Sequence, residues 1–201
     1  MSIILTLVAI AAWIWLLLIL RRAELKFWHY ILGAAGLFTI LMLLVRPVMT
    51  LPLARIVAAV AGIFGKITDF YQAYFRYGVI FIESGKEAIT VNIDLECSGI
   101  IEISAFLSLI VFFEVYSIPE RIYFGIIGAL YTLLSNSFRI AVICTFIHFA
   151  GPDYYYIAHT LLGRIVFYVL QVLLYFFVFT RYQVRRTRTG DFEYSKEGLP
   201  S

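Results

Sequence analysis

Charged residues are scarce in this chain, because Asp, Glu, Lys and Arg together make up 14% of its 201 residues. Soluble globular domains carry about 25%. Hydrophobic residues account for 62% of the chain, and the mean hydropathy is +0.91. A soluble domain of this size could not hide so much apolar surface from water, so the sequence predicts an integral membrane protein.

The chain also lacks the short motifs of several common chemistries. It contains no zinc-ligand spacing, no phosphate-binding loop and no serine-nucleophile motif, and it has only two cysteines. We therefore expect no metal and no cofactor. The net charge of +3 comes from basic residues that cluster just outside apolar segments, which is typical of membrane orientation signals. We expect no binding to nucleic acid.

Long hydrophobic runs are what the chain has in abundance. A membrane-spanning helix needs about 20 mostly apolar residues. Five stretches qualify, at residues 3–20, 27–45, 98–116, 122–148 and 156–180. No basic residue precedes the first stretch and no small-residue cleavage site follows it, so we interpret it as a retained helix and not as a secretion signal.

Basic clusters set the expected orientation. Arg21, Arg22 and Lys26 separate the first two stretches, and four arginines follow the last stretch within 181–188. Both regions should be cytoplasmic, since basic residues concentrate on that side. The N-terminus, residues 46–96 and residues 149–156 then lie outside, whereas residues 117–122 form a turn inside.

The external segment 46–96 has three predicted parts. Residues 49–65 are apolar with helical spacing, but Pro52 and Arg55 interrupt them, which favours an amphipathic surface helix or a re-entrant segment over a true span. Residues 66–78 are rich in aromatics and suggest an interfacial helix. Polar and β-branched residues then alternate around Gly85, which predicts a β-hairpin.

Three reactive side chains are expected at one depth near the outer face. Cys97 lies at the outer entrance of the third span and His159 at the outer entrance of the fifth. Arg139 follows residue 122 by 17 positions, which places it about 25 Å along the fourth helix and near the outer leaflet. Ionisable groups within spans are costly, so they are candidates for function.

These side chains suit cysteine acyl transfer. The imidazole of His159 can take the proton of the Cys97 thiol, and a helix N-terminus favours the resulting thiolate. Backbone N–H groups at Ser98 and Gly99 could face an oxyanion. Arg139 could stabilise the thiolate, the oxyanion or a carboxylate of the substrate.

Each of the three residues also has a purely structural interpretation. Cys97 could be a small apolar filler, Arg139 could extend to lipid phosphate, and His159 could be an interfacial residue beside a tyrosine cluster. Cys144 could form a disulfide with Cys97 in an oxidising exterior. His148 could replace His159 as the base, although it ends its span. The residues alone leave these alternatives open.

Two further polar residues are predicted to support the site. Asn136 shares a helix face with Arg139, because the two are three residues apart. Glu102, in the third span, could orient Arg139 or pair with Arg164.

Three ordered motifs resemble the signature regions of the exosortase/archaeosortase family. They are "ECSGI" at 96–100, "LLSNSFRI" at 133–140 and "AHTLLGRIVF" at 158–167, on consecutive predicted spans. The similarity covers roughly residues 53–180, and it is closest to short exosortase-type members of Gram-positive bacteria. Archaeal members have a second arginine where His159 stands, so this histidine favours the exosortase branch.

The resemblance implies a membrane cysteine peptidase or transpeptidase that acts on exported proteins. Its substrate would carry a C-terminal sorting signal, which consists of a short motif, a transmembrane helix and a basic cytoplasmic end. The family's nucleophile corresponds to Cys97, its essential arginine to Arg139 and its third residue to His159. Many members have a small residue where Glu96 stands. An anion there disfavours the thiolate, so Arg139 has to offset it.

We therefore predict an all-α polytopic membrane protein with about five to six transmembrane helices, plus a small external amphipathic helix and a β-hairpin before the catalytic span. Residues 1–180 would form one transmembrane catalytic domain, and residues 181–201 a basic, disordered cytoplasmic tail. Such an enzyme would use a thioester intermediate at the outer face. The competing hypothesis is a non-catalytic membrane scaffold of a surface-polymer or export system. A small transporter would need polar residues near the midplane, which the clustering at one edge disfavours.

Overall fold

The computed structural model of the protein describes residues 3–84, 87–93, 95 and 97–180. Its main elements are α1 (Ile3–Arg22), α2 (Lys26–Leu44), α3 (Arg46–Thr68), β1 (Tyr71–Tyr74), β2 (Val79–Ser84), β3 (Glu87–Asn92), α4 (Ile100–Phe112) and α5 (Ile118–Ala150). A last helical stretch consists of η1 (Pro152–Tyr154), α6 (Tyr155–Ile157), η2 (Ala158–Leu162), α7 (Gly163–Tyr175) and η3 (Phe176–Thr180). Glu96 and the tail 181–201, both named in the predictions above, lie outside the described residues.

Five helices in the described part of the chain are long and apolar enough to cross a membrane. They are Leu5–Arg22, Lys26–Leu44, Arg46–Thr68, Ile118–Ala150 and Pro152–Thr180. The predicted multi-pass helical class is therefore confirmed. The list differs from the predicted spans at two places, because α3 is long and apolar enough to cross, whereas α4, which lies in the predicted span 98–116, is too short by the same measure.

Helix α4 is shorter than its apolar sequence suggested. It has 13 residues, which is about 20 Å of helix and less than a bilayer core. Gly99 precedes it in the left-handed conformation, and the backbone becomes extended at Phe113. Phe113 and Tyr116, which follow the helix, are buried. The apolar run thus continues into a buried loop, which hydrophobicity alone cannot distinguish from more helix.

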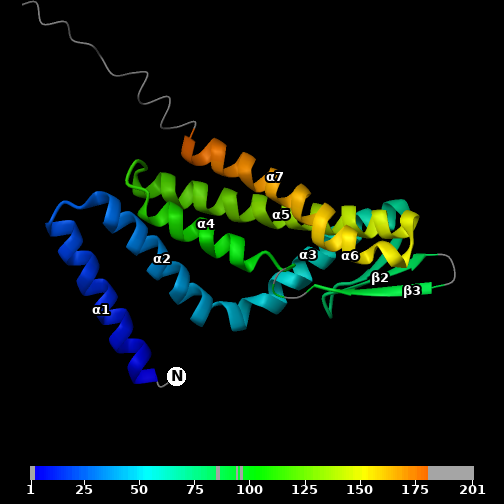
Figure 1. The fold of residues 1–201 in the computed structure, drawn as a ribbon, viewed down its shortest axis with the longest axis horizontal. Coiled ribbons are helices and arrows are strands. Elements are labelled where there is room, and N and C mark those ends of the chain that lie inside the picture. The colour runs from blue at the N-terminus through cyan, green and yellow to red at the C-terminus, as the bar shows by residue number, and fades with distance from the viewer. Residues whose placement is uncertain (1–2, 85–86, 94, 96, 181–201) are drawn as a thin grey trace, which may run out of the picture.

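Helix α3 is an unbroken helix of 23 residues, so the expectation that Pro52 and Arg55 interrupt the helical stretch 49–65 is wrong. Pro52 lies inside it without ending it. In Figure 1, α2 runs from one end of the molecule to its middle, and α3 continues from there toward the sheet instead of folding back. Together, α2 and α3 extend along roughly the same length of the molecule as the single helix α5.

The predicted hairpin is confirmed and belongs to a three-stranded antiparallel sheet in the order β1-β2-β3. The expected interfacial helix at 66–78 is wrong, because residues 71–74 form β1. Asp69, in the left-handed conformation, ends α3 just before the strand. The ring of Tyr71 then turns back onto α3 and its hydroxyl donates to the carbonyl oxygen of Ala61 at 2.7 Å. Burial raises the pKa of this hydroxyl well above its usual range.

Helix α5 is the longest element, with 33 residues, which is about 50 Å. It begins at Ile118, so the predicted inside turn 117–122 is mostly helix. The cause is a capping box, in which the backbone N–H of Ser117 donates to the carboxylate of Glu120 at 2.8 Å. Helices α4, α5 and α7 lie side by side along the long axis, and the sheet lies at one end (Figure 1). The α1–α2 turn, the α4–α5 loop and the end of η3, all predicted cytoplasmic, share the opposite end.

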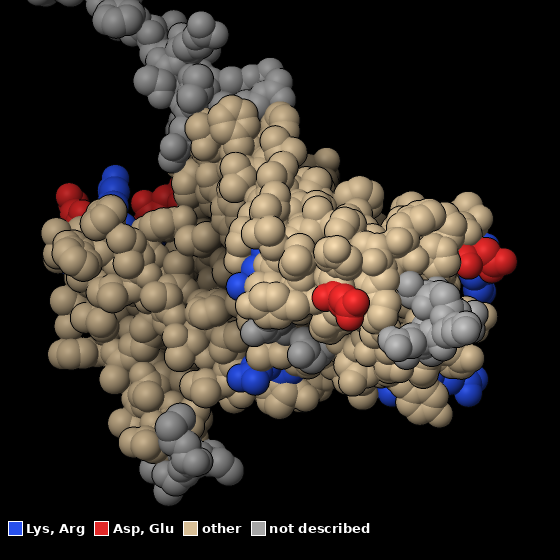
Figure 2. Space-filling view, turned by 45° about the vertical axis from the view of Figure 1, so that its right-hand side comes forward, with Lys and Arg blue, Asp and Glu red and all other residues tan. Residues whose placement is uncertain are grey.

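The buried side chains form two separate cores. The sheet-end core includes Ala54, Ala58, Ala61, Ile80, Ile82, Cys97, Ile140 and Cys144. The aromatic core lies toward the other end and consists of Phe106, Ile110, Phe113, Tyr116, Leu174 and Val178. In the view of Figure 2, most of the surface is formed by residues other than Lys, Arg, Asp and Glu, as expected for a protein that faces lipid.

Candidate active site

Cys97 occupies the turn that leads from the sheet into α4, and it is 1% exposed. Gly99 closes this turn with φ of 78°, a left-handed conformation that glycine adopts without strain. The hydroxyl of Ser98 donates to the carbonyl oxygen of Leu95 at 3.0 Å and accepts from the backbone N–H of Ile100 at 3.4 Å. Ser98 and Gly99 therefore hold the turn that carries the thiol.

Helix α5 brings Asn136 and Arg139 to the same turn. Both are buried, at 0% and 4% exposure, and their spacing of three places them on one helix face. The side-chain amide of Asn136 donates to the carbonyl oxygen of Cys97. Nη2 of Arg139 donates to Sγ of Cys97 at 3.7 Å. Asn136 thus contacts the backbone of Cys97, and Arg139 contacts its sulfur.

His159 approaches the sulfur from the last helical stretch. Its Nε2 lies 3.2 Å from Sγ of Cys97. The residue belongs to η2, a π-helical turn within an otherwise α-helical stretch, and such turns occur frequently at functional sites. The ring of Tyr155, one turn earlier, stacks on the imidazole with a centroid distance of 5.8 Å and an interplanar angle of 13°. This stacking restrains the orientation of the imidazole.

Phe167 supports the guanidinium of Arg139. The Cζ atom of Arg139 lies 5.6 Å from the centroid of this ring, within the range of a cation–π contact. The ring is 2% exposed, so the contact is shielded from solvent. Sequence reasoning missed both Phe167 and Tyr155. The spacing of four between Tyr155 and His159 could have indicated their contact, but nothing in the sequence separates Phe167 from other apolar residues of α7.

The arrangement can support a nucleophilic thiolate. A proton acceptor and a fixed cation both contact Sγ of Cys97, and the turn precedes the N-terminus of α4, whose dipole favours an anion. The described residues contain no group of three or more His, Cys, Asp or Glu side chains placed to hold a metal ion. The structure thus brings Cys97, Arg139 and His159 together, with Asn136, Ser98 and Gly99 around the cysteine.

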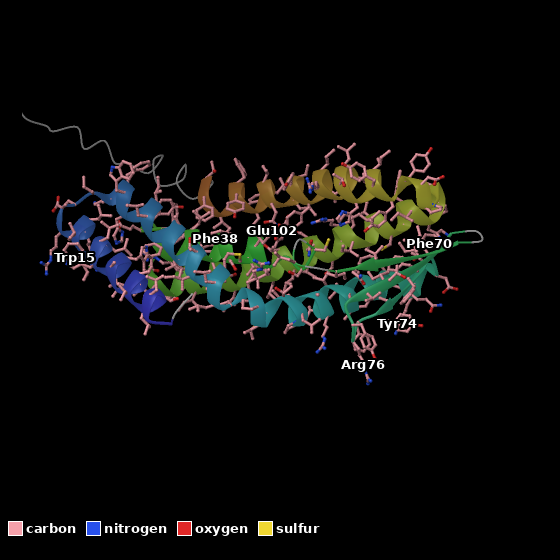
Figure 3. The ribbon with its side chains drawn as sticks, turned by 60° about the horizontal axis from the view of Figure 1, so that its bottom comes forward. Trp15, Phe38, Phe70, Tyr74, Arg76 and Glu102 are labelled. Atoms are coloured by element: carbon pink, nitrogen blue, oxygen red, sulfur yellow. The ribbon has the colours of Figure 1, made fainter. Side chains whose placement is uncertain are left out.

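The other candidates were Glu102, His148 and a disulfide between Cys97 and Cys144. Glu102 lies in the first turn of α4 with its Oε2 atom buried, and Figure 3 shows it among the helices. His148 stacks on Phe70 at the sheet end, with centroids 4.8 Å apart. Neither Cys97 nor Cys144 is part of a disulfide in the structure, so the possible bond between them is not formed.

Comparison with known proteins identifies the family of the chain. The family described as Transmembrane exosortase (Exosortase_EpsH) matches residues 1–176. No curated protein and no solved structure matches the chain. The family match covers most of the sequence, so the chain belongs to the transmembrane exosortase family, which is a family of membrane transpeptidases.

Proposed function

We propose that this member of the transmembrane exosortase family is a cysteine peptidase or transpeptidase that cleaves the C-terminal sorting signal of exported proteins. The observation that carries the proposal is the pair of contacts on one sulfur, with Nε2 of His159 at 3.2 Å and Nη2 of Arg139 at 3.7 Å from Sγ of Cys97. A filler cysteine needs neither contact. Family membership supplies the general class of reaction.

In the first half of the reaction, the Cys97 thiol loses its proton to His159 and the thiolate attacks the scissile carbonyl carbon. A carbon–sulfur bond forms as the carbonyl electron pair moves to the oxygen, which becomes an oxyanion. Arg139 stabilises this negative charge. The carbon–nitrogen bond then breaks, and His159 gives its proton to the leaving amine. The upstream fragment remains bound to Cys97 as a thioester.

In the second half, an amine or water attacks the thioester carbonyl. His159 takes a proton from the attacking group, and the carbon–sulfur bond breaks to release the Cys97 thiolate, which His159 reprotonates. An amine acceptor makes the enzyme a transpeptidase, whereas water makes it a protease. Asn136 positions the nucleophile in both halves, since its amide donates to the carbonyl oxygen of Cys97.

The site is proposed to act on the extracellular side, with residues 1–180 as one catalytic domain and residues 181–201 in the cytoplasm. Basic residues at the α1–α2 turn and after residue 180 support this orientation. The sulfur lies at the opposite side of α4 from the α4–α5 loop, and hence away from the proposed cytoplasmic end. The substrate would be a protein anchored in the same membrane.

The decisive experiment replaces the nucleophile. Cys97→Ala and Cys97→Ser should keep the protein at normal abundance and abolish processing of its exported substrate, measured as accumulation of the uncleaved form. In the unchanged enzyme, a substrate fragment bound through a hydroxylamine-sensitive thioester should be recovered on Cys97 by mass spectrometry.

Cys144 provides the matched control, because it is the other cysteine of the chain and is likewise buried. Cys144→Ala should leave processing intact. If Cys97→Ala processes its substrate normally, the protein is not a cysteine peptidase. In that case the scaffold hypothesis gains support, provided that Arg139 and His159 substitutions lower abundance only.

A further inference from the structure

A second site lies in the membrane part of the molecule, away from the thiol. Helices α2, α4 and α7 enclose a groove of about 930 Å³, which we call the membrane groove. Figure 2 shows the surface hollowed between the lobe of α1 and α2 and the ridge of α7. The lining is mostly aromatic and aliphatic and includes Tyr30, Phe112, Tyr168, Val172 and Phe176. A groove with this lining, open to the bilayer, selects an apolar occupant.

Gln171 is a buried polar residue of this lining. It is 7% exposed, and both polar atoms of its side chain lack a hydrogen-bond partner among the described residues. It lies 12 residues beyond His159, about 18 Å deeper in the membrane. A buried amide without partners is unfavourable there. A lipid chain could not satisfy it, whereas a polar side chain on another membrane helix could once the Gln171 side chain turns toward the groove, because both of its polar atoms are covered in the structure.

The dimensions of the groove fit a helix. The α7 and η3 residues that line it extend from Tyr168 to Thr180, about 18 Å of helix. A volume of 930 Å³ over that length corresponds to a cross-section of about 50 Å². A helix about 10 Å wide has a cross-section of about 80 Å². The groove is therefore long enough for about three turns of a helix, part of which would stay in contact with lipid.

The groove is connected to the site through two elements. Helix α4 begins three residues after Cys97 and lines the groove with its last turn, and the helical stretch that carries His159 continues as the α7 wall. At the far end, Glu114 lines the groove beside Lys26; its side chain is 53% exposed and lies 3.9 Å from His29. A basic residue that follows an incoming helix would meet this carboxylate.

We propose that the membrane groove receives the transmembrane helix of the substrate, with a polar side chain of that helix bonded to Gln171. The inference rests on the proposed function, because the helix belongs to the protein that Cys97 would cut. The chain's own tail does not suit the groove. Residues 181–201 follow Thr180 at its mouth, but their sequence is too polar for an apolar lining.

Photocrosslinking in membranes tests the proposal. A photoreactive phenylalanine analogue is placed at position 172, which lines the groove, in the full-length chain that also carries Cys97→Ala. The matched control places it at position 173, where Leu173 is exposed but does not line the groove. We expect position 172 to crosslink the membrane helix of the protein that accumulates uncleaved in Cys97→Ala cells, and position 173 not to.

The outcomes separate the two proposals. If the uncleaved protein accumulates but position 172 crosslinks only lipid, a second copy of this chain, or no more than position 173 does, the groove assignment is wrong and the proposed function stands. If no exported protein accumulates in Cys97→Ala cells, both proposals fail.

Gln171→Leu measures the polar contact itself. With a substrate that carries the crosslinked helix, in proteoliposomes, we expect the substrate concentration for half-maximal cleavage to rise about threefold, with the maximal rate unchanged. Gln171→Asn should recover part of this affinity because it keeps the amide. A lower maximal rate at unchanged half-saturation would overturn the role of Gln171 in substrate binding.

Discussion

The two cores of this protein are packed in different ways. The sheet-end core uses small side chains, with Ala54, Ala58 and Ala61 of α3 facing the sheet and α5. The aromatic core uses rings, such as Phe113 and Phe179, whose centroids lie 5.0 Å apart at an angle of 84°. Small residues let backbones approach closely, whereas rings keep helices apart and fill the space with side chains.

The difference corresponds to two tasks. At the sheet end, a long helix and a π-helical turn hold the side chains of Arg139 and His159 within contact distance of the sulfur of Cys97. Close backbone packing fixes such distances, because the elements have little room to shift. Around the aromatic core, the helices leave the membrane groove open between α2 and α7. We therefore expect substitutions at the sheet end to change chemistry or folding sharply, and those near the aromatic core to have milder effects.

The largest expected effect is the loss of substrate processing when His159, one of the three histidines, is replaced. His159→Gln should lower processing at least 100-fold, since general acid–base catalysis contributes about 10²–10⁴-fold, and Gln cannot carry the proton. Protein abundance should stay near normal. The measurement is the initial rate of substrate cleavage at equal enzyme abundance.

His148→Gln and His29→Gln are the controls for this prediction. His148 stacks on Phe70 at the sheet end, and His29 lies beside Glu114 at the other end. Both variants should process substrate within a few-fold of the unchanged enzyme. A comparable loss in His148→Gln would mean that the imidazole next to the thiol is not the proton carrier.

Two glycine-to-alanine substitutions, at Gly65 and Gly128, test whether the two cores are packed differently. A Cβ on Gly65 would overlap the carbonyl oxygen and the ring of Tyr71, whereas one on Gly128 would overlap only the ring of Phe106. We expect Gly65→Ala to lower the free energy of unfolding by about 1–3 kcal/mol. Gly128→Ala should cost less, because a side chain can shift more easily than a backbone. Thermal unfolding of the purified proteins in detergent measures both.

Backgrounds that remove the overlapping ring sharpen this test. Once Phe106→Leu is present, Gly128→Ala should cost little more, because the overlapping ring is gone. In a Tyr71→Leu background, Gly65→Ala should still destabilise, because the backbone carbonyl of Tyr71 remains in place. Equal recovery in both backgrounds would contradict the proposed difference in packing between the two cores.

Much of the fold could be predicted from hydrophobicity because the bilayer imposes a length on each helix. The first two helices and the last two spans lie close to their predicted ranges. Two errors have the same cause, which is that apolar character does not report backbone conformation. Phe113 and Tyr116 are aromatic and buried but lie in a loop, and Tyr71 and Tyr74 belong to a segment rich in aromatics that pairs with β2. Pairing partners and buried loops depend on tertiary contacts that no local pattern encodes.

The site was predictable in its members but not in its surroundings. Depth along the helices was enough to suggest that Cys97, Arg139 and His159 meet, because ionisable side chains in spans are rare and their positions follow from helix rise. The contact of Asn136 with the carbonyl oxygen of Cys97 and the ring of Phe167 at Arg139 depend on how α5 and α7 face each other. Helix rotation of that kind cannot be read from spacing alone.

The smallest expected effect concerns the ring of Phe167, which contacts Arg139. Phe167→Leu keeps an apolar side chain of similar volume but removes the cation–π contact with Arg139, which is worth about 0.5–2 kcal/mol. If the guanidinium is held for transition-state stabilisation, kcat/KM should fall roughly 2- to 30-fold with little change in the unfolding temperature. Phe177→Leu is the control, since Phe177 is an exposed ring of η3, and it should leave kcat/KM unchanged. Equal kcat/KM in both variants would show that Phe167 only fills space, as the rings of the aromatic core do.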